Sequence, residues 1–158
     1  AAAYGLQICS PYEPDPEKRV KPFPVNSVKA LRGAGFAQQA GRFLDYSYRV
    51  FHAYWGQRRD ISQDAQLRAI AAESGLNADA FMTYIATPEA KKLVTDNTDE
   101  VMQRGGYGSP TFFVNGSHMY FGNDRLLLLE RRVMLELGQT PIGFGEWKVG
   151  GKSPISNL

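Results

Sequence analysis

The sequence of 158 residues contains a single cysteine, Cys9. One thiol cannot form an internal disulfide, and dithiol oxidoreductases need two thiols close together, usually as Cys-x-x-Cys at the start of a helix. The residues that follow Cys9 are Ser10, Pro11 and Tyr12, so the sequence offers no second thiol. We therefore interpret Cys9 as a small core residue and expect a reducing compartment, the cytoplasm.

The sequence also lacks long apolar runs and any marked excess of one charge. No run approaches the roughly 18 apolar residues of a membrane-spanning helix, and we expect no signal peptide from residues 1–3 (Ala-Ala-Ala). The 18 basic and 16 acidic residues are interspersed and leave a net charge of +2. This balance favours neither a nucleic acid nor a membrane surface as a partner. The 43% of hydrophobic residues is ordinary for one globular domain with a subdomain.

Short patterns divide the chain into four segments. Residues 1–26 hold an apolar strand at 4–9 and a loop interrupted by prolines. Residues 27–104 contain only helical patterns. The predicted helix starts are Asn26 or Ser27, Gly41, Ser62, Asn77 and Thr87. Residues 105–137 combine a β-hairpin with a helix, and residues 138–158 form a tail rich in Gly and Pro.

The second predicted helix, residues 41–56, carries a broad apolar stripe. Its members recur every three or four residues and are Phe43, Leu44, Tyr48, Phe51 and Trp55. We expect Tyr48, Phe51 and Trp55, together with the neighbouring Tyr54, to line the core, because the apolar side of a surface helix packs inward. Tyr48, Phe51 and Trp55 are also candidates for the wall of an aromatic substrate pocket, since ligand pockets are often lined by such side chains.

The last third of the chain changes to the period of a strand. Residues 111–114 (Thr-Phe-Phe-Val) form a predicted buried strand, Asn115-Gly116 is a strong hairpin signal, and residues 118–121 form the return strand. Asn123 or Asp124 is expected to cap the helix that follows.

Two motifs in this part of the chain are specific in combination. They are Ser-Pro-Thr-Phe-Phe at 109–113 and Gly-Asn-Asp-Arg-Leu at 122–126, and Phe-Pro-Val-Asn-Ser at 23–27 adds support. Over about residues 4–133 the chain resembles the 2-hydroxychromene-2-carboxylate isomerase family, whose members are similar to kappa-class glutathione transferases. The resemblance implies an α/β, thioredoxin-like (DsbA-like) domain with a large helical insertion.

Members of that family begin with a strand and a helix that carry a serine facing the glutathione sulfur, often as Ser-Pro-Tyr. A βαβ unit takes about 30 residues or more, and only three residues precede Tyr4. We therefore expect the first strand and helix, with the catalytic serine, upstream of residue 1. Ser10-Pro11-Tyr12 matches the motif superficially but lies on the family's second strand, so Ser10 is the alternative position for this serine.

The resemblance also implies how glutathione is bound. Ser109 and a cis Pro110 would pair with its extended cysteinyl segment as an added strand does. Backbone amides and the carboxylate at Asn123 and Asp124 would hold the γ-glutamyl end. The alternative for Asn123 and Asp124 is an ordinary helix cap, and both roles are compatible.

We therefore expect a glutathione-dependent isomerase or transferase that acts on aromatic or unsaturated small molecules, and the family adds a homodimer as an expectation. His52 and His118 lack partners at metal-ligand spacing, so no metal is expected. Two alternatives stay open. One is a DsbA-like thiol-disulfide oxidoreductase, which needs Cys-x-x-Cys upstream of residue 1. The other is a non-catalytic interaction module, if the chain truly begins at Ala1.

Overall fold

The computed structural model describes residues 24–141. Several predictions fall outside these residues: the strand at 4–9, the proline-rich loop up to residue 23, Cys9, Ser10 and the tail from residue 142 onward. The described chain separates into two compact units between Thr98 and Asp99.

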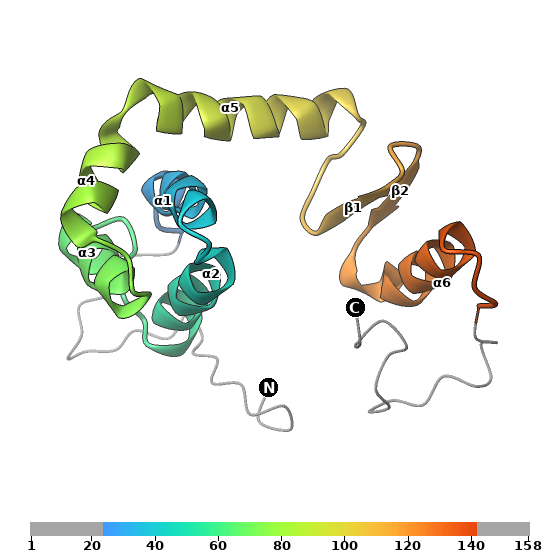
Figure 1. The fold of residues 1–158 in the computed structure, drawn as a ribbon, viewed down its shortest axis with the longest axis horizontal. Helices are drawn as coiled ribbons and strands as arrows, with labels where there is room; N and C mark the ends of the chain where they lie inside the picture. The colour runs from blue at the N-terminus through green and yellow to red at the C-terminus, as the bar shows by residue number, and fades with distance from the viewer. Residues whose placement is uncertain (1–23, 142–158) are drawn as a thin grey trace. The chain divides into compact units, whose positions relative to one another are not determined.

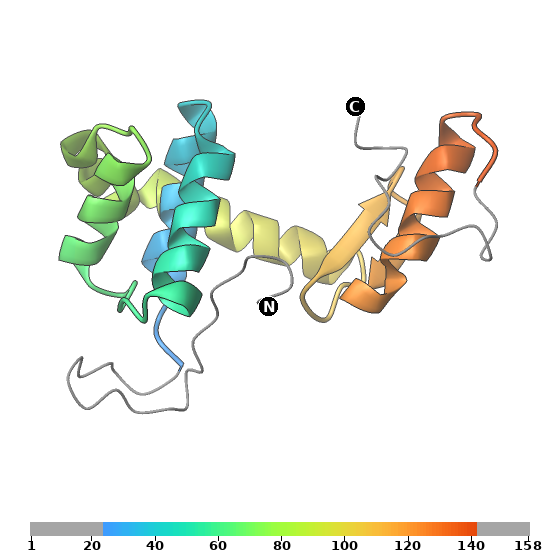
Figure 2. The same ribbon diagram turned by 90° about the horizontal axis from the view of Figure 1, so that it is seen from below.

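The first unit is helical (Figures 1 and 2). Its elements are α1 (Val28–Gln39), α2 (Phe43–Phe51), the π-helix η2 (His52–Gly56), α3 (Asp64–Glu73), α4 (Ala78–Ala86) and the first part of α5 (Pro88–Gln103). Residues 24–98 of the described chain contain no strand, in agreement with the helical patterns of the sequence.

Polar side chains cap the predicted starts of α1, α4 and α5. The accepting oxygens belong to Asn26, Asn77 and Thr87 and lie 3.0, 3.0 and 3.2 Å from backbone nitrogens of the first helical turn. The start predicted at Ser62 is displaced. The Ser62 hydroxyl donates to Asp60 Oδ1 at 2.5 Å, and α3 begins at Asp64.

The core of the first unit lies between α1, α2, α3 and α4. Its largest fully buried side chains are Tyr46, Leu67, Ile70 and Phe81. The rings of Tyr46 and Phe81 have their centroids 5.5 Å apart. A Cβ atom at Gly33 of α1 would collide with both of these side chains. The absence of a side chain at Gly33 therefore lets α1 approach the core closely.

α2 buries a different face from the predicted one. Four members of the apolar stripe are exposed: Phe43 (45%), Leu44 (80%), Tyr48 (65%) and Phe51 (64%). The expectation that Tyr48 and Phe51 line the core is therefore wrong. Tyr46 and Ala53, which are buried, mark the inner face instead. The tyrosine hydroxyl donates to the carbonyl oxygen of Ala30 at 3.0 Å, and this bond fixes which face of α2 meets α1.

The second unit contains the end of α5 and an antiparallel hairpin. β1 (Thr111–Val114) pairs with β2 (His118–Phe121), and the predicted turn is confirmed. Asn115 and Gly116 have φ values of 47° and 77°, in the left-handed region that Asn and Gly tolerate best. β1 is half-buried in the described chain, although a buried strand was predicted.

Gly122, with φ of 97°, connects β2 to the 3-10 helix η3 (Asn123–Arg125), which continues into α6 (Leu126–Glu136). The predicted cap is wrong: Gly122 and Arg125 occupy the N-cap positions of η3 and α6, and neither makes a side-chain cap hydrogen bond. Asn123 and Asp124 lie inside the 3-10 turn. Among residues 24–141, no helix is long and apolar enough to cross a membrane.

Candidate functional site

The loop before β1 is joined to the start of η3. The peptide bond between Ser109 and Pro110 is cis. The Pro110 carbonyl accepts a hydrogen bond from the Gly122 N–H at 2.9 Å, and the Thr111 hydroxyl donates to the Gly108 carbonyl at 2.5 Å. The first bond extends the β1–β2 ladder by one step, so the proline loop and the residues after β2 lie side by side.

Aromatic packing against Phe121 fixes the residues that precede Ser109 in this loop. The rings of Tyr107 and Phe121 have their centroids 4.6 Å apart, and a Cβ atom at Gly108 would collide with the Phe121 ring. Ser109 is exposed, and its backbone and hydroxyl have no hydrogen bond within the described chain. Within residues 24–141 the Ser109 amide and carbonyl therefore have no partner and can pair with another extended peptide.

Asn123 and Asp124 provide a different set of groups beside this loop. Both are exposed, and their backbone N–H groups make no hydrogen bond with other described residues, as is usual in the first turn of a helix. The Asp124 carboxylate lies 3.5 Å from the Arg125 guanidinium. Free amides beside a carboxylate can bind a group that carries both an anion and a cation.

The predicted residues of this site therefore lie together in the second unit: Ser109, Pro110, Asn123 and Asp124. The hydrogen bond between Pro110 and Gly122 connects the two pairs. The sequence motifs identified all four residues, but the spatial link through the backbone of Gly122 was not predicted.

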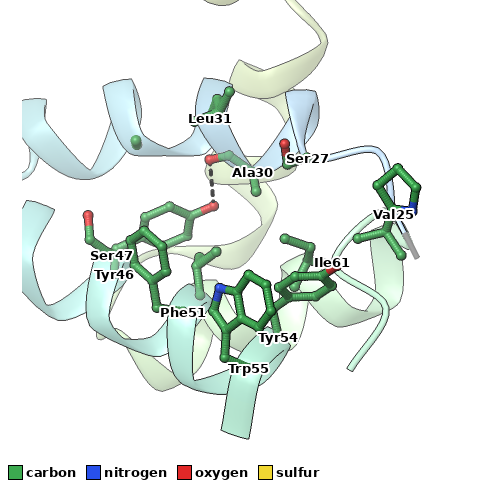
Figure 3. A pocket seen from close by; sticks show the side chains of 13 residues that line it. Val25, Ser27, Ala30, Leu31, Tyr46, Ser47, Phe51, Tyr54, Trp55 and Ile61 are labelled. Carbon is green, nitrogen blue, oxygen red and sulfur yellow. Dashed lines mark hydrogen bonds between the residues drawn. The ribbon is translucent and has the colours of Figure 1, made fainter. Parts of the chain in front are cut away.

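The first unit contains an apolar pocket of about 370 Å³ (Figure 3). Phe51 and Trp55, two of the candidates for the wall of an aromatic substrate pocket, line it. Tyr48 does not line this pocket. Its ring stacks on His52 with the centroids 5.9 Å apart, and this contact also gives His52 a structural role.

Tyr54, which was expected beside Trp55 in the apolar stripe, also lines the pocket, and Ala34 is one of several lining residues that the sequence patterns did not indicate. Tyr54 and Trp55 are neighbours in the sequence, and an α-helix points such neighbours about 100° apart. The π-helix η2 changes this spacing and places both rings at the pocket. A search for the period of 3.6 residues cannot find such a pair.

The second histidine, His118, lies at the other end of the hairpin from the proline loop. Its Nε2 atom is 3.9 Å from the Glu136 carboxylate. Among residues 24–141, no group of three or more His, Cys, Asp or Glu side chains is arranged to hold a metal ion.

This arrangement of a proline loop, a hairpin and a helix after a helical block can be compared with known proteins. The profile of the DSBA-like thioredoxin domain matches residues 1–134. The chain belongs to this family. A solved structure of 2-hydroxychromene-2-carboxylate isomerase superposes with a TM-score of 0.65 at 25% identity, over 87% of this chain and 62% of that chain. The predicted DsbA-like thioredoxin fold is therefore confirmed.

Curated relatives of this DSBA-like chain are also similar in sequence. The 2-hydroxychromene-2-carboxylate isomerase of Sphingobium xenophagum is 34% identical over 92 residues, which are 58% of this chain and 45% of that protein. The isomerase of Pseudomonas putida is 31% identical over 115 residues, 68% of this chain and 54% of that protein. Human glutathione S-transferase kappa 1 is 32% identical over 81 residues, 48% of this chain and 36% of that protein. The chain thus spans about half the length of the isomerases it matches.

Proposed function

We propose that this DSBA-like protein is a glutathione-dependent isomerase or transferase that acts on aromatic or unsaturated small molecules. The observation that carries the proposal is the position of the Ser109 backbone beside the amides of Asn123 and Asp124, none of which makes a hydrogen bond within residues 24–141. Relatives named as isomerases and as a glutathione transferase support the same class of reaction.

The groups present in the second unit fit the two ends of glutathione. The Ser109 amide and carbonyl pair with the extended cysteinyl segment in the manner of an added strand. The amides of Asn123 and Asp124 bind the γ-glutamyl carboxylate, and the Asp124 carboxylate binds the ammonium group beside it. Ser109, Asn123 and Asp124 are exposed in the described chain, as binding of the tripeptide requires.

When bound, glutathione would supply a thiolate for reversible addition to a carbon–carbon double bond of the substrate; the bond would become single and able to rotate, and elimination of the thiolate would restore it. We propose that a serine hydroxyl, as the family resemblance implies, favours the thiolate form of bound glutathione. The described residues hold and orient the tripeptide, and the proposed ligands of the protein are glutathione and one small aromatic molecule. We further propose that the protein works in the cytoplasm as a homodimer.

Calorimetric titration of the whole protein with glutathione tests this proposal. We expect millimolar or tighter binding, and Asp124→Asn should weaken it about threefold to tenfold because the substitution removes the partner of the ammonium group. Asp99→Asn is the matched control. Asp99 is exposed and makes no ion pair with other described residues, so its substitution should leave the affinity unchanged. Absence of millimolar binding by the wild-type protein would overturn the proposal.

A further inference from the structure

The turn of the hairpin contains a dipeptide that is prone to react with itself. Asn115 is the only asparagine of the sequence that is followed by a glycine, Gly116. The backbone nitrogen of the following residue can attack the side-chain carbonyl carbon of an asparagine, and glycine obstructs this attack least because it has no Cβ atom. Asn115 and Gly116 are both exposed, so water and hydroxide reach the dipeptide.

The attacking nitrogen has no partner in the described chain. The Gly116 N–H makes no hydrogen bond with other described residues. A Cβ atom at Gly116 would meet no atom within 4 Å, so the turn is not packed against other described parts of the chain on that side. The nitrogen can therefore react without first losing a hydrogen bond, and the turn has space in which to adjust.

The Asn115 side chain connects the turn to the last turn of α6. Its Nδ2 atom donates a hydrogen bond to Glu136 Oε2 at 2.7 Å. The other oxygen of this carboxylate, Oε1, lies 3.5 Å from the Arg132 guanidinium and 3.9 Å from His118 Nε2. The Asn115 amide is thus the closest of these three partners of Glu136, and a reaction that removes the amide nitrogen removes this contact.

We propose that Asn115 is a site of spontaneous deamidation, and that the reaction releases the last turn of α6 from the hairpin. The Gly116 nitrogen loses its proton and forms a bond to the Asn115 Cγ atom, and the bond between Cγ and Nδ2 breaks. Nδ2 takes up the proton and leaves as ammonia, so that a cyclic imide remains. One water molecule then opens the imide and gives aspartate or isoaspartate, without an oxidant or a reductant.

Both products change the contact with Glu136. An ionised carboxylate accepts hydrogen bonds but cannot donate one, so the donor to Glu136 Oε2 is lost. At neutral pH the new carboxylate and Glu136 also carry charges of the same sign. Arg132, and His118 when it is protonated, attract both carboxylates but do not replace the hydrogen bond between the turn and α6.

Incubation of the whole protein at neutral and at mildly alkaline pH, followed by peptide mapping with mass spectrometry, tests the site. We expect Asn115 to convert to aspartate and isoaspartate, and to do so faster at the higher pH because hydroxide removes the proton of the attacking nitrogen. Asn97 is the internal control, since it is exposed on α5 but is followed by Thr98, and it should convert more slowly. Conversion of Asn115 no faster than that of Asn97 would overturn the proposal.

The contact with Glu136 is tested by Glu136→Ala, which removes the acceptor of the Asn115 amide. Asn115 should deamidate about twofold to tenfold faster in this variant, because the hydrogen bond no longer holds the amide in place. Glu89→Ala is the matched control. Glu89 is exposed and makes no ion pair with other described residues, so the rate should equal that of wild type. Equal rates in Glu136→Ala and wild type would contradict the role of this contact.

Asn115→Asp represents the aspartate product, and aspartate tolerates the positive φ of this position. Amide hydrogen exchange in the last turn of α6 and in the hairpin should become about threefold faster or more in this variant. Wild-type protein that has deamidated during incubation should show the same increase. Unchanged exchange in both samples would overturn the proposed release of α6.

Discussion

Tyr46 is 1% exposed and connects two helices through one hydroxyl group. It lies on α2 and donates to the Ala30 carbonyl of α1 at 3.0 Å. Burial raises the pKa of this hydroxyl well above its ordinary value, because the phenolate would lose its hydration in the core. The folded protein therefore keeps the Tyr46 proton at a pH at which the unfolded chain releases it.

Removal of this hydroxyl in Tyr46→Phe is expected to lower the free energy of unfolding by about 1 kcal/mol at pH 7, the usual value of a buried hydrogen bond. Above about pH 10 the unfolded wild-type chain ionises at Tyr46 and gains stability relative to the folded state. The difference between wild type and Tyr46→Phe should therefore shrink as the pH rises through this range. Denaturant unfolding at pH 7, 9 and 10.5 measures it, and a difference that stays constant would contradict the assigned burial of the hydroxyl.

Among individual residues, the sequence predicts best those whose backbone conformation depends on their own amino-acid type and not on distant contacts. Asn115 and Gly116 specify their turn because few other residues tolerate a positive φ. Asn123 and Asp124 were identified as a pair, but their role as a cap was wrong. Gly122 is the N-cap of the 3-10 helix η3, so Asn123 and Asp124 lie inside this helix. The amino-acid types alone do not distinguish a cap residue from one inside the helix.

At the scale of elements, one carboxylate fastens α6 to the hairpin. Glu136 in the last turn of α6 accepts a hydrogen bond from the Asn115 side chain at 2.7 Å. The Arg132 guanidinium lies 3.5 Å from the same carboxylate, and a side-chain hydrogen bond to Tyr120 raises the pKa of Arg132. Side chains of α6, the turn and β2 thus form one polar network.

A double-mutant cycle between Asn115 and Glu136 tests this network. Asn115→Gly removes the side chain and keeps the positive φ, and Glu136→Gln removes the charge. We expect each substitution to lower the opening free energy of the hairpin amides by about 0.5–1.5 kcal/mol, with a coupling energy of about 0.5–1 kcal/mol. Amide hydrogen exchange of β1 and β2 measures these values. Strictly additive effects would show that the side chains do not interact in solution.

The prediction for α2 failed at this scale for a physical reason. Its period of three to four residues was read correctly, yet the helix has apolar residues on two faces, and packing buries the face of Tyr46. Which face turns inward depends on close approach at Gly33 of α1 and on the acceptor at Ala30. Both are contacts between residues far apart in the sequence, and the periodicity of a single helix carries no information about such contacts.

At the scale of the whole molecule, sequence motifs and the order of elements together indicated the family. A helical block followed by a proline loop, a hairpin and a helix predicted the DsbA-like fold, and the match to the DSBA-like thioredoxin domain over residues 1–134 agrees. The four residues proposed to hold glutathione all lie in the second unit of the described chain.

The most direct test of the proposed function is the isomerisation of 2-hydroxychromene-2-carboxylate by the whole protein, followed by absorbance with and without glutathione. We predict that glutathione increases the rate in a saturable manner, and that Asp124→Asn raises the glutathione concentration needed for half the maximal rate by about threefold to tenfold. Asp99→Asn should behave as wild type. Turnover at the same rate without glutathione, or glutathione binding without any isomerase or transferase activity, would contradict the proposed function.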